Sequence, residues 1–224
     1  MSTVRTMLGQ AHSRIVNLEC LSSPLRAATR LAPRFVIRNN TMICSTDGSL
    51  GWGGEAVWLQ DLSRLRAGEP NRLEAVVANN TIVVDNGGVD AGISGAYADD
   101  IKVVNNRISG TGMAAITVET APTVWGFQFG SGSGWQIIGN DVSGLHAVGY
   151  GGRPPAQIWL GEGASHCLVI GGCRPTTVLD EGTDNTLINV KELVWSPSAL
   201  TSRLMAPGAV PPTRRVTLQL VRRY

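Results

Sequence analysis

A short β-branched segment that ends in a pair of turn residues recurs along this chain. Four clear copies occupy residues 35–42, 75–82, 102–108 and 136–142, and weaker copies follow at 168–172 and 186–190. A unit this short cannot bury its apolar side alone, so neighbouring copies must stack and share a core. The repeat therefore predicts a solenoid.

A second set of apolar segments lies between these copies. Its members are Val57–Leu59, Ile93–Gly95, Ile116–Val118, Ile158–Leu160 and Val178–Asp180. Their spacing indicates a coil of roughly twenty-odd residues with insertions in some coils. Each coil then offers at least two strands, and coils wound in one sense place equivalent strands in parallel sheets.

The second turn residue is asparagine in the four clear copies, at Asn40, Asn80, Asn106 and Asn140. Asparagine tolerates the left-handed backbone region, and its side-chain amide can bond the equivalent residue one coil away. We expect these four residues to form a structural ladder. Gly172 takes the same place in the fifth copy, which we interpret as a requirement for positive φ.

Two stretches, residues 92–109 and 178–186, resemble the repeat of right-handed parallel β-helix proteins of the pectate-lyase-like superfamily. The resemblance covers about residues 35–190. It implies an all-β fold, a right-handed parallel β-helix of about six coils. It does not imply one activity, because the superfamily includes polysaccharide lyases, glycoside hydrolases, uronate epimerases, phage tailspikes and adhesins.

The sequence divides into a capping segment at 1–34, the β-helix at 35–190 and a basic, proline-containing tail at 191–224. The apolar residues Val4, Leu8, Ala11, Ile15 and Leu18 have the spacing of one helix face. They predict a short amphipathic α-helix that covers the edge of the first coil. The tail could pack along the β-helix or pair with a neighbouring subunit.

Charge is unevenly distributed. Residues 39–190 carry seven Lys and Arg against fifteen Asp and Glu, whereas both ends are basic. An acidic body would repel phosphates, so we expect no nucleic-acid groove. Apolar runs stay far below about 18 residues, so we expect no membrane span. The first residues lack the layout of a secretory signal, and the compartment stays open.

The four cysteines, Cys20, Cys44, Cys167 and Cys173, are too scattered for a zinc cage. We expect Cys167 and Cys173 to be ordinary thiols, with a disulfide between them as the alternative.

Two insertions, residues 119–134 and 143–156, leave adjacent coils, so we expect them to meet in a cleft. They hold four of the chain's twelve Phe, Tyr and Trp residues. The candidate binding residues in them are Trp125, His146, Tyr150 and Arg153. Aromatic faces on a polar groove suit sugar rings. The insertions therefore predict recognition of a carbohydrate polymer on the lateral face.

Two further candidates, Trp58 and Trp159, occupy the middle of strands in the second set. Because Val57 and Ile158 take the inward positions, strand alternation turns both tryptophans outward. There they either contact substrate or are covered by loops or by the tail.

The acids Glu119 and Glu162 lie beside the same strands and are our candidate catalytic pair. Stacking at about 4.8 Å brings carboxylates of successive coils within the range of glycosidase chemistry, and such oxygens also suit Ca²⁺. We interpret Asp180 and Asp184 as turn acids that bond backbone N–H groups.

Lyase, epimerase or hydrolase activity is a hypothesis here, since the superfamily's catalytic motifs match nowhere residue by residue. The alternative is a non-catalytic structural or assembly module that forms a homo-oligomer through its tail or its end coils. Six coils are short for an enzyme of this superfamily, which favours the alternative.

Overall fold

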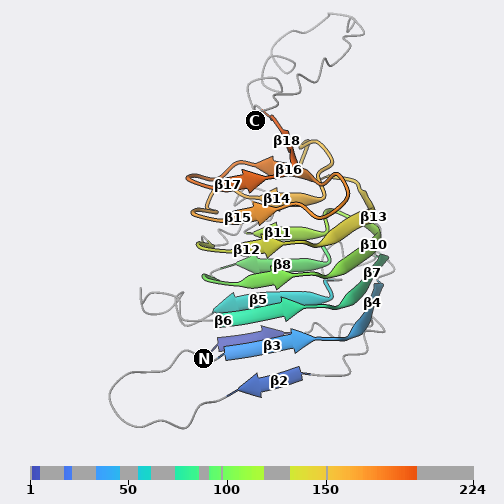
Figure 1. The fold of residues 1–224 in the computed structure, drawn as a ribbon, viewed down its shortest axis with the longest axis vertical. Helices are drawn as coiled ribbons and strands as arrows, with labels where there is room; N and C mark the ends of the chain where they lie inside the picture. The colour runs from blue at the N-terminus through green and yellow to red at the C-terminus, as the bar shows by residue number, and fades with distance from the viewer. Residues whose placement is uncertain are drawn as a thin grey trace, which may run out of the picture.

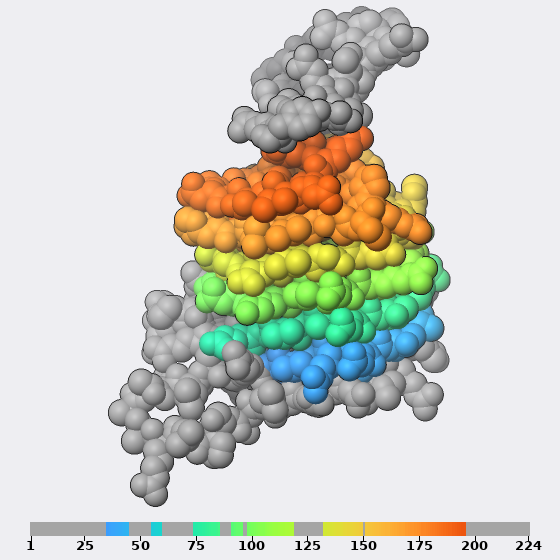
Figure 2. Space-filling view, in the orientation of Figure 1, coloured from blue at the N-terminus to red at the C-terminus, as the bar shows by residue number. Residues whose placement is uncertain are grey.

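A computed structural model describes residues 2–5, 18–21, 34–45, 55–61, 74–85, 91–96, 98–118, 132–149 and 151–195. Every regular element among them is a β-strand, and the strands form three sheets (Figure 1). The coils lie on one another as successive layers along the long axis (Figure 2). The described chain is therefore a parallel β-solenoid closed at one end by antiparallel strands.

The first sheet, called sheet B, contains the strands of the sequence repeat. Its parallel strands are β3 (Arg34–Arg38), β6 (Glu74–Ala78), β9 (Lys102–Val104), β12 (Gln136–Ile138), β15 (Leu168–Ile170) and β17 (Thr186–Ile188). They confirm six coils. The short strand β2 (Leu18–Leu21) adds to β3 in the antiparallel sense.

The second sheet, called sheet A, contains the second set of apolar segments. Its parallel strands are β5 (Val57–Asp61), β8 (Ile93–Ala96), β11 (Ile116–Val118), β14 (Ile158–Leu160), β16 (Thr177–Asp180) and β18 (Lys191–Leu193). The strand β1 (Ser2–Arg5) pairs antiparallel with β5. The strand β18 lies beyond residue 190, in the segment that we assigned to the tail.

The third sheet, called sheet C, was not identified from the sequence. Its strands follow the asparagine turns directly and are β4 (Thr41–Ser45), β7 (Thr81–Asp85), β10 (Arg107–Gly112) and β13 (Asp141–Ala147). Residues 143–147 of the insertion that we placed at 143–156 are thus strand rather than loop. Its strand signal is weak because Gly144 interrupts it and shifts the register against β10.

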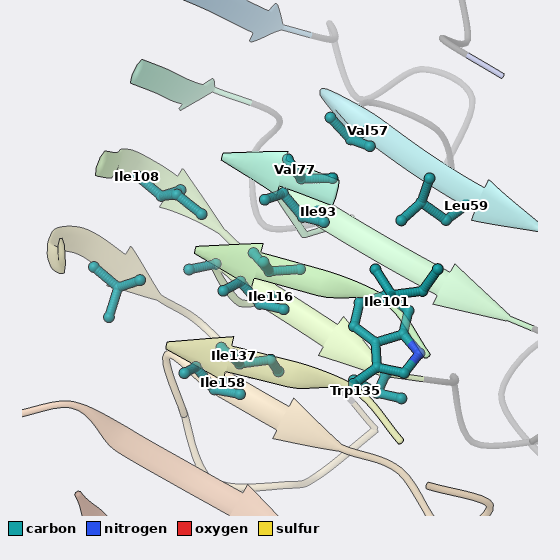
Figure 3. Close-up of a cluster of buried hydrophobic side chains, with 14 of the residues drawn as sticks. Val57, Leu59, Val77, Ile93, Ile101, Ile108, Ile116, Trp135, Ile137 and Ile158 are labelled. Carbon is teal, nitrogen blue, oxygen red and sulfur yellow. The ribbon is translucent and has the colours of Figure 1, made fainter. Parts of the chain in front are cut away.

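The core lies between the three sheets and contains at least one inward residue from each strand from β3 to β16. In one coil these are Val77 on β6, Ile82 on β7 and Ile93 on β8, each fully buried. Figure 3 shows the side chains of Val77 and Ile93 in this core. Trp135 is also fully buried among them, and its Nε1 donates to the carbonyl of Ala98 at 2.6 Å. Its ring lies over Gly95, where a Cβ would come within 2.3 Å of it.

The asparagine ladder is confirmed. The backbone N–H and the Nδ2 of Asn40 both donate to Oδ1 of Asn80, at 3.0 and 3.1 Å. The same pair of bonds joins Asn80 to Asn106 and Asn106 to Asn140, at 2.9 to 3.0 Å. All four side chains are buried. The ladder thus satisfies polar groups that would otherwise be unpaired inside the turn.

Positive φ belongs to the residue before each ladder member, which corrects our expectation. Asn39, Asn79 and Asn105 have φ of 53° to 58°, and Gly139 has φ of 64°. Gly172 does share the register position of Asn140 but does not have positive φ. Close packing is the constraint there instead, because a Cβ on Gly172 would lie 3.1 Å from the carbonyl oxygen of Asn140.

The predicted helical cap is a strand at both of its described ends. Val4 lies in β1 and Leu18 lies in β2, and both strands pair antiparallel with the first coil. The rest of the predicted helix, residues 6–17, lies outside the described residues.

Candidate functional site

The outer face of sheet A carries one register-matched row of side chains. The row runs Trp58, Ser94, Thr117, Trp159, Leu179 and Leu193. Their neighbours Val57, Ile93 and Ile158 belong to the core, so the row points away from it, as predicted for the two tryptophans. The row is nevertheless covered: Trp159 is 4% exposed, and Trp58 is half-buried.

An ion pair lies over the middle of this face. Arg153, in the connection between β13 and β14, donates from Nε to both carboxylate oxygens of Glu181, at 2.7 and 3.0 Å. Glu181 follows β16 directly, and its Oε2 also accepts the indole N–H of Trp159 at 2.6 Å. One carboxylate thereby joins a connecting segment to two successive strands.

Two indole rings enclose the same guanidinium. The Cζ of Arg153 lies 5.0 Å from the ring centroid of Trp159 and 4.4 Å from that of Trp195. The side chains of Arg153 and Glu181 are 6% and 8% exposed. Burial removes water from both charges, which costs free energy. The ion pair compensates for this cost, and the contacts of the guanidinium with the two indole rings add to this compensation. We call Arg153, Trp159, Glu181 and Trp195 the arginine clasp.

A small pocket adjoins the clasp. Its lining comes from the residues just before β11, from the β13–β14 connection and from the outer row of sheet A. The lining residues are Met113, Ala114, Gly149, Arg153, Pro154, Ala156, Trp159 and Leu179. Most of this lining is apolar, and the guanidinium of Arg153 supplies the charge. Glu162 lies at the exposed side, with Oε1 3.8 Å from Nη2 of Arg153 and its side chain 59% exposed.

The structure therefore brings three predicted site residues together: Arg153, Trp159 and Glu162. His146 lies elsewhere, exposed on β13 of sheet C and opposite Thr111 of β10. Glu119, Trp125 and Tyr150 lie outside the described residues, so neither the catalytic pair Glu119–Glu162 nor the meeting of the two insertions is tested.

Sequence reasoning missed the acid that matters most in this cluster. Glu181 was not among the candidate residues, and Trp195 lies in the segment that we assigned to the tail. The available signal was the position of Glu181 directly after the strand that pairs with the strand of Trp159. The turn interpretation of the neighbouring Asp180 is confirmed: its Oδ1 accepts from Gly182 N at 3.0 Å and Asn185 Nδ2 at 2.9 Å.

Three cysteines are free thiols: Cys44 and Cys167, which are buried, and Cys173, which is exposed. Burial raises the pKa of Cys44 to about 12, with the Glu55 carboxylate adding to the effect, and raises that of Cys167 to about 11. Both are therefore protonated and unreactive at neutral pH. Among the described residues, no three His, Cys, Asp or Glu side chains are grouped to hold a metal ion.

Within the part of the chain that the structure describes, no helix is long and apolar enough to cross a membrane. No protein-family model matches the chain, and searches of curated proteins and of solved structures find no match either.

Proposed function

We propose that the chain recognises a carbohydrate polymer on the outer face of sheet A, at the pocket beside the arginine clasp. The observation that supports this proposal is the orientation of the Arg153 guanidinium. Its Nε is used by Glu181, whereas Nη2 is 3.8 Å from Glu162, too far for a hydrogen bond. The Arg153 side chain is only 6% exposed, so a ligand can reach it only at the edge where Nη2 faces the exposed Glu162. Sugar hydroxyls are suitable partners for both groups at that edge.

The family resemblance supports the same location. We propose that the coils wind in the right-handed sense, which parallel strand crossovers strongly prefer, as in the pectate-lyase-like superfamily. In similar β-helix enzymes the substrate lies in a lateral groove between a sheet and long connecting loops. Lyase, epimerase or hydrolase activity forms part of the proposal, with Glu162 and Glu119 as the acids and Ca²⁺ as the candidate ion.

A glycan array, probed with the full chain in Ca²⁺ and in chelator, tests the binding proposal. We expect a polysaccharide class to bind and Glu162→Ala to weaken that binding by at least tenfold. Asp85→Ala, an exposed acid on sheet C, is the matched control and should bind normally. Absence of binding to every glycan, with and without Ca²⁺, would contradict the proposal.

The second candidate is a non-catalytic assembly module that oligomerises through its end coils or tail. It is favoured by two apolar side chains in the last described coil, Ile188 at 47% and Val194 at 71% exposed. In that case the glycan array is blank and the chain forms a stable oligomer that Val194→Lys disrupts.

A further inference from the structure

The outer face of sheet B carries two rows of side chains that follow all six coils. One row is Val36, Val76, Lys102, Gln136, Leu168 and Thr186, and the other is Arg38, Ala78, Val104, Ile138, Ile170 and Ile188. Every member is half-buried or exposed, in contrast to the buried row of sheet A. This face is turned toward the viewer in Figure 2, where it forms continuous layers.

The second row is aliphatic in five successive coils, from Ala78 to Ile188. Strand spacing of about 4.8 Å makes the six-coil face about 24 Å long. Contiguous apolar surface of this kind usually marks an interaction site, because isolated exposed aliphatic residues are normal but a continuous stripe is not.

We propose that two copies of this chain pack face to face through sheet B, with their long axes antiparallel. The third coil of one copy then lies on the fourth coil of the other, so Val104 meets Ile138 and Lys102 meets Gln136. The second coil lies on the fifth, so Val76 meets Leu168.

The polar residues at the margin support the antiparallel arrangement. Glu74 lies two residues before Val76, and His166 lies two residues before Leu168, so the two exposed side chains are opposed. Parallel axes would exchange the two rows and place Lys102 of each copy on Val104 of the other, which would desolvate a charge against an aliphatic side chain. Antiparallel axes leave one such contact, Arg38 on Ile188 at the ends of the face, whereas parallel axes would also place Arg38 on Val36. The antiparallel arrangement therefore sets fewer charges against aliphatic side chains.

The size of the face sets the strength of the interaction. Its length and the width of the two rows give an area on the order of 500 Å² per copy, which is below the roughly 800 Å² per partner of standard stable interfaces. The dimer is therefore weak and reversible. It does not require that the pocket on sheet A binds sugar, because the two faces belong to different sheets.

Sedimentation velocity of the full chain, from about 1 μM to several hundred μM, tests this proposal. We expect a shift from monomer to dimer that Ile138→Glu weakens by at least tenfold. The matched control is Ile43→Glu, because Ile43 is an aliphatic residue on sheet C that is 51% exposed. It should dimerise normally.

The antiparallel register has its own test, which also serves if Ile138→Glu fails to fold by circular dichroism. Gln136→Glu places a carboxylate opposite Lys102 and should tighten the dimer, whereas Gln136→Lys should loosen it. A monomer at every concentration would overturn the proposal, whether the face is covered by another part of the chain or by a different protein. Equal dimer affinity of the two position-136 variants, or a trimer, would overturn it as well.

Discussion

The asparagine ladder and the arginine clasp are both buried polar clusters, but they arise in opposite ways. The ladder repeats one interaction between equivalent residues of successive coils, and each amide meets the same partner in the same geometry. The clasp occurs once and joins Arg153 of a connection to Glu181 after a strand and Trp159 within one. A repeated cluster can be recognised by aligning the chain with itself, whereas a single-copy cluster depends on the path of one connection.

The largest expected effect is on the ladder. Asn106→Ala removes Oδ1, which accepts from the backbone N–H and the Nδ2 of Asn80. It also removes Nδ2, which donates to Asn140 Oδ1 and to the Val77 carbonyl. Each buried group left unpaired costs about 1–3 kcal/mol. We expect urea denaturation to show a loss of about 5 kcal/mol in the free energy of unfolding.

The matched control for that variant is the preceding residue. Asn105 is exposed and has φ of 53°, which glycine adopts without strain. Asn105→Gly should change the free energy of unfolding by less than about 1 kcal/mol. If the two variants lost similar stability, the division of roles between the two turn residues would be wrong.

The clasp should give the next largest effect. Arg153→Met leaves the Glu181 carboxylate buried without its cation, and breaking a buried pair in this way costs about 3–5 kcal/mol. We expect a loss of about 3 kcal/mol in the free energy of unfolding, at the low end because Trp159 still donates to Glu181. Arg153→Met with Glu181→Met should recover most of it, and a double variant as unstable as the single one would contradict this account.

These two clusters show what the sequence could predict. Six coils, two of the three sheets and all four ladder residues follow from the repeat, because the same local pattern must satisfy the same environment in each coil. The roles of the two turn residues were not separated, although the fourth copy has Gly139 where the others have Asn39, Asn79 and Asn105. That glycine was the signal that the first turn residue has positive φ. Sheet C was missed because its strands follow the turn directly, and Gly144 breaks the pattern in one of them.

The candidate site was predictable in part. The outward direction of Trp159 followed from strand alternation. Its cover did not, because it depends on the contact of Arg153 with Glu181, 28 residues further along the chain. The burial of Trp135 could likewise not be predicted from the repeat. A tryptophan fills the core in one coil only, and the other coils use different residues there.

Trp135 allows a test of a single-copy feature inside the repeating core. Gly95→Ala would place a Cβ 2.3 Å from the Trp135 ring, and such overpacking costs about 1–3 kcal/mol. We expect thermal and urea unfolding to show a loss of about 2 kcal/mol. Adding Trp135→Phe should relieve much of the clash, so that the double variant loses less than the two single losses combined. Strict additivity would show that the two residues are not in contact.

The smallest predicted effect concerns Cys44, whose pKa is raised to about 12 by burial. The folded state resists ionisation of this thiol, so its contribution to stability is complete below pH 9 and is lost as pH rises toward 12. The loss is about 1.4 kcal/mol for each pH unit in that range. Free energies of unfolding at pH 8 and pH 10 should therefore differ less in Cys44→Ala than in the unmodified chain. An equal difference in both would contradict the burial of this thiol.

The central claim is that equivalent turns of successive coils lie in contact through their asparagine amides. Nuclear magnetic resonance of the labelled chain tests it through the side-chain amide protons of Asn40, Asn80, Asn106 and Asn140. The structure predicts slow hydrogen exchange at these groups and nuclear Overhauser effects from Asn40 to Asn80, Asn80 to Asn106 and Asn106 to Asn140. Fast exchange at all four groups, with no such effects between them, would contradict the stacked-coil structure.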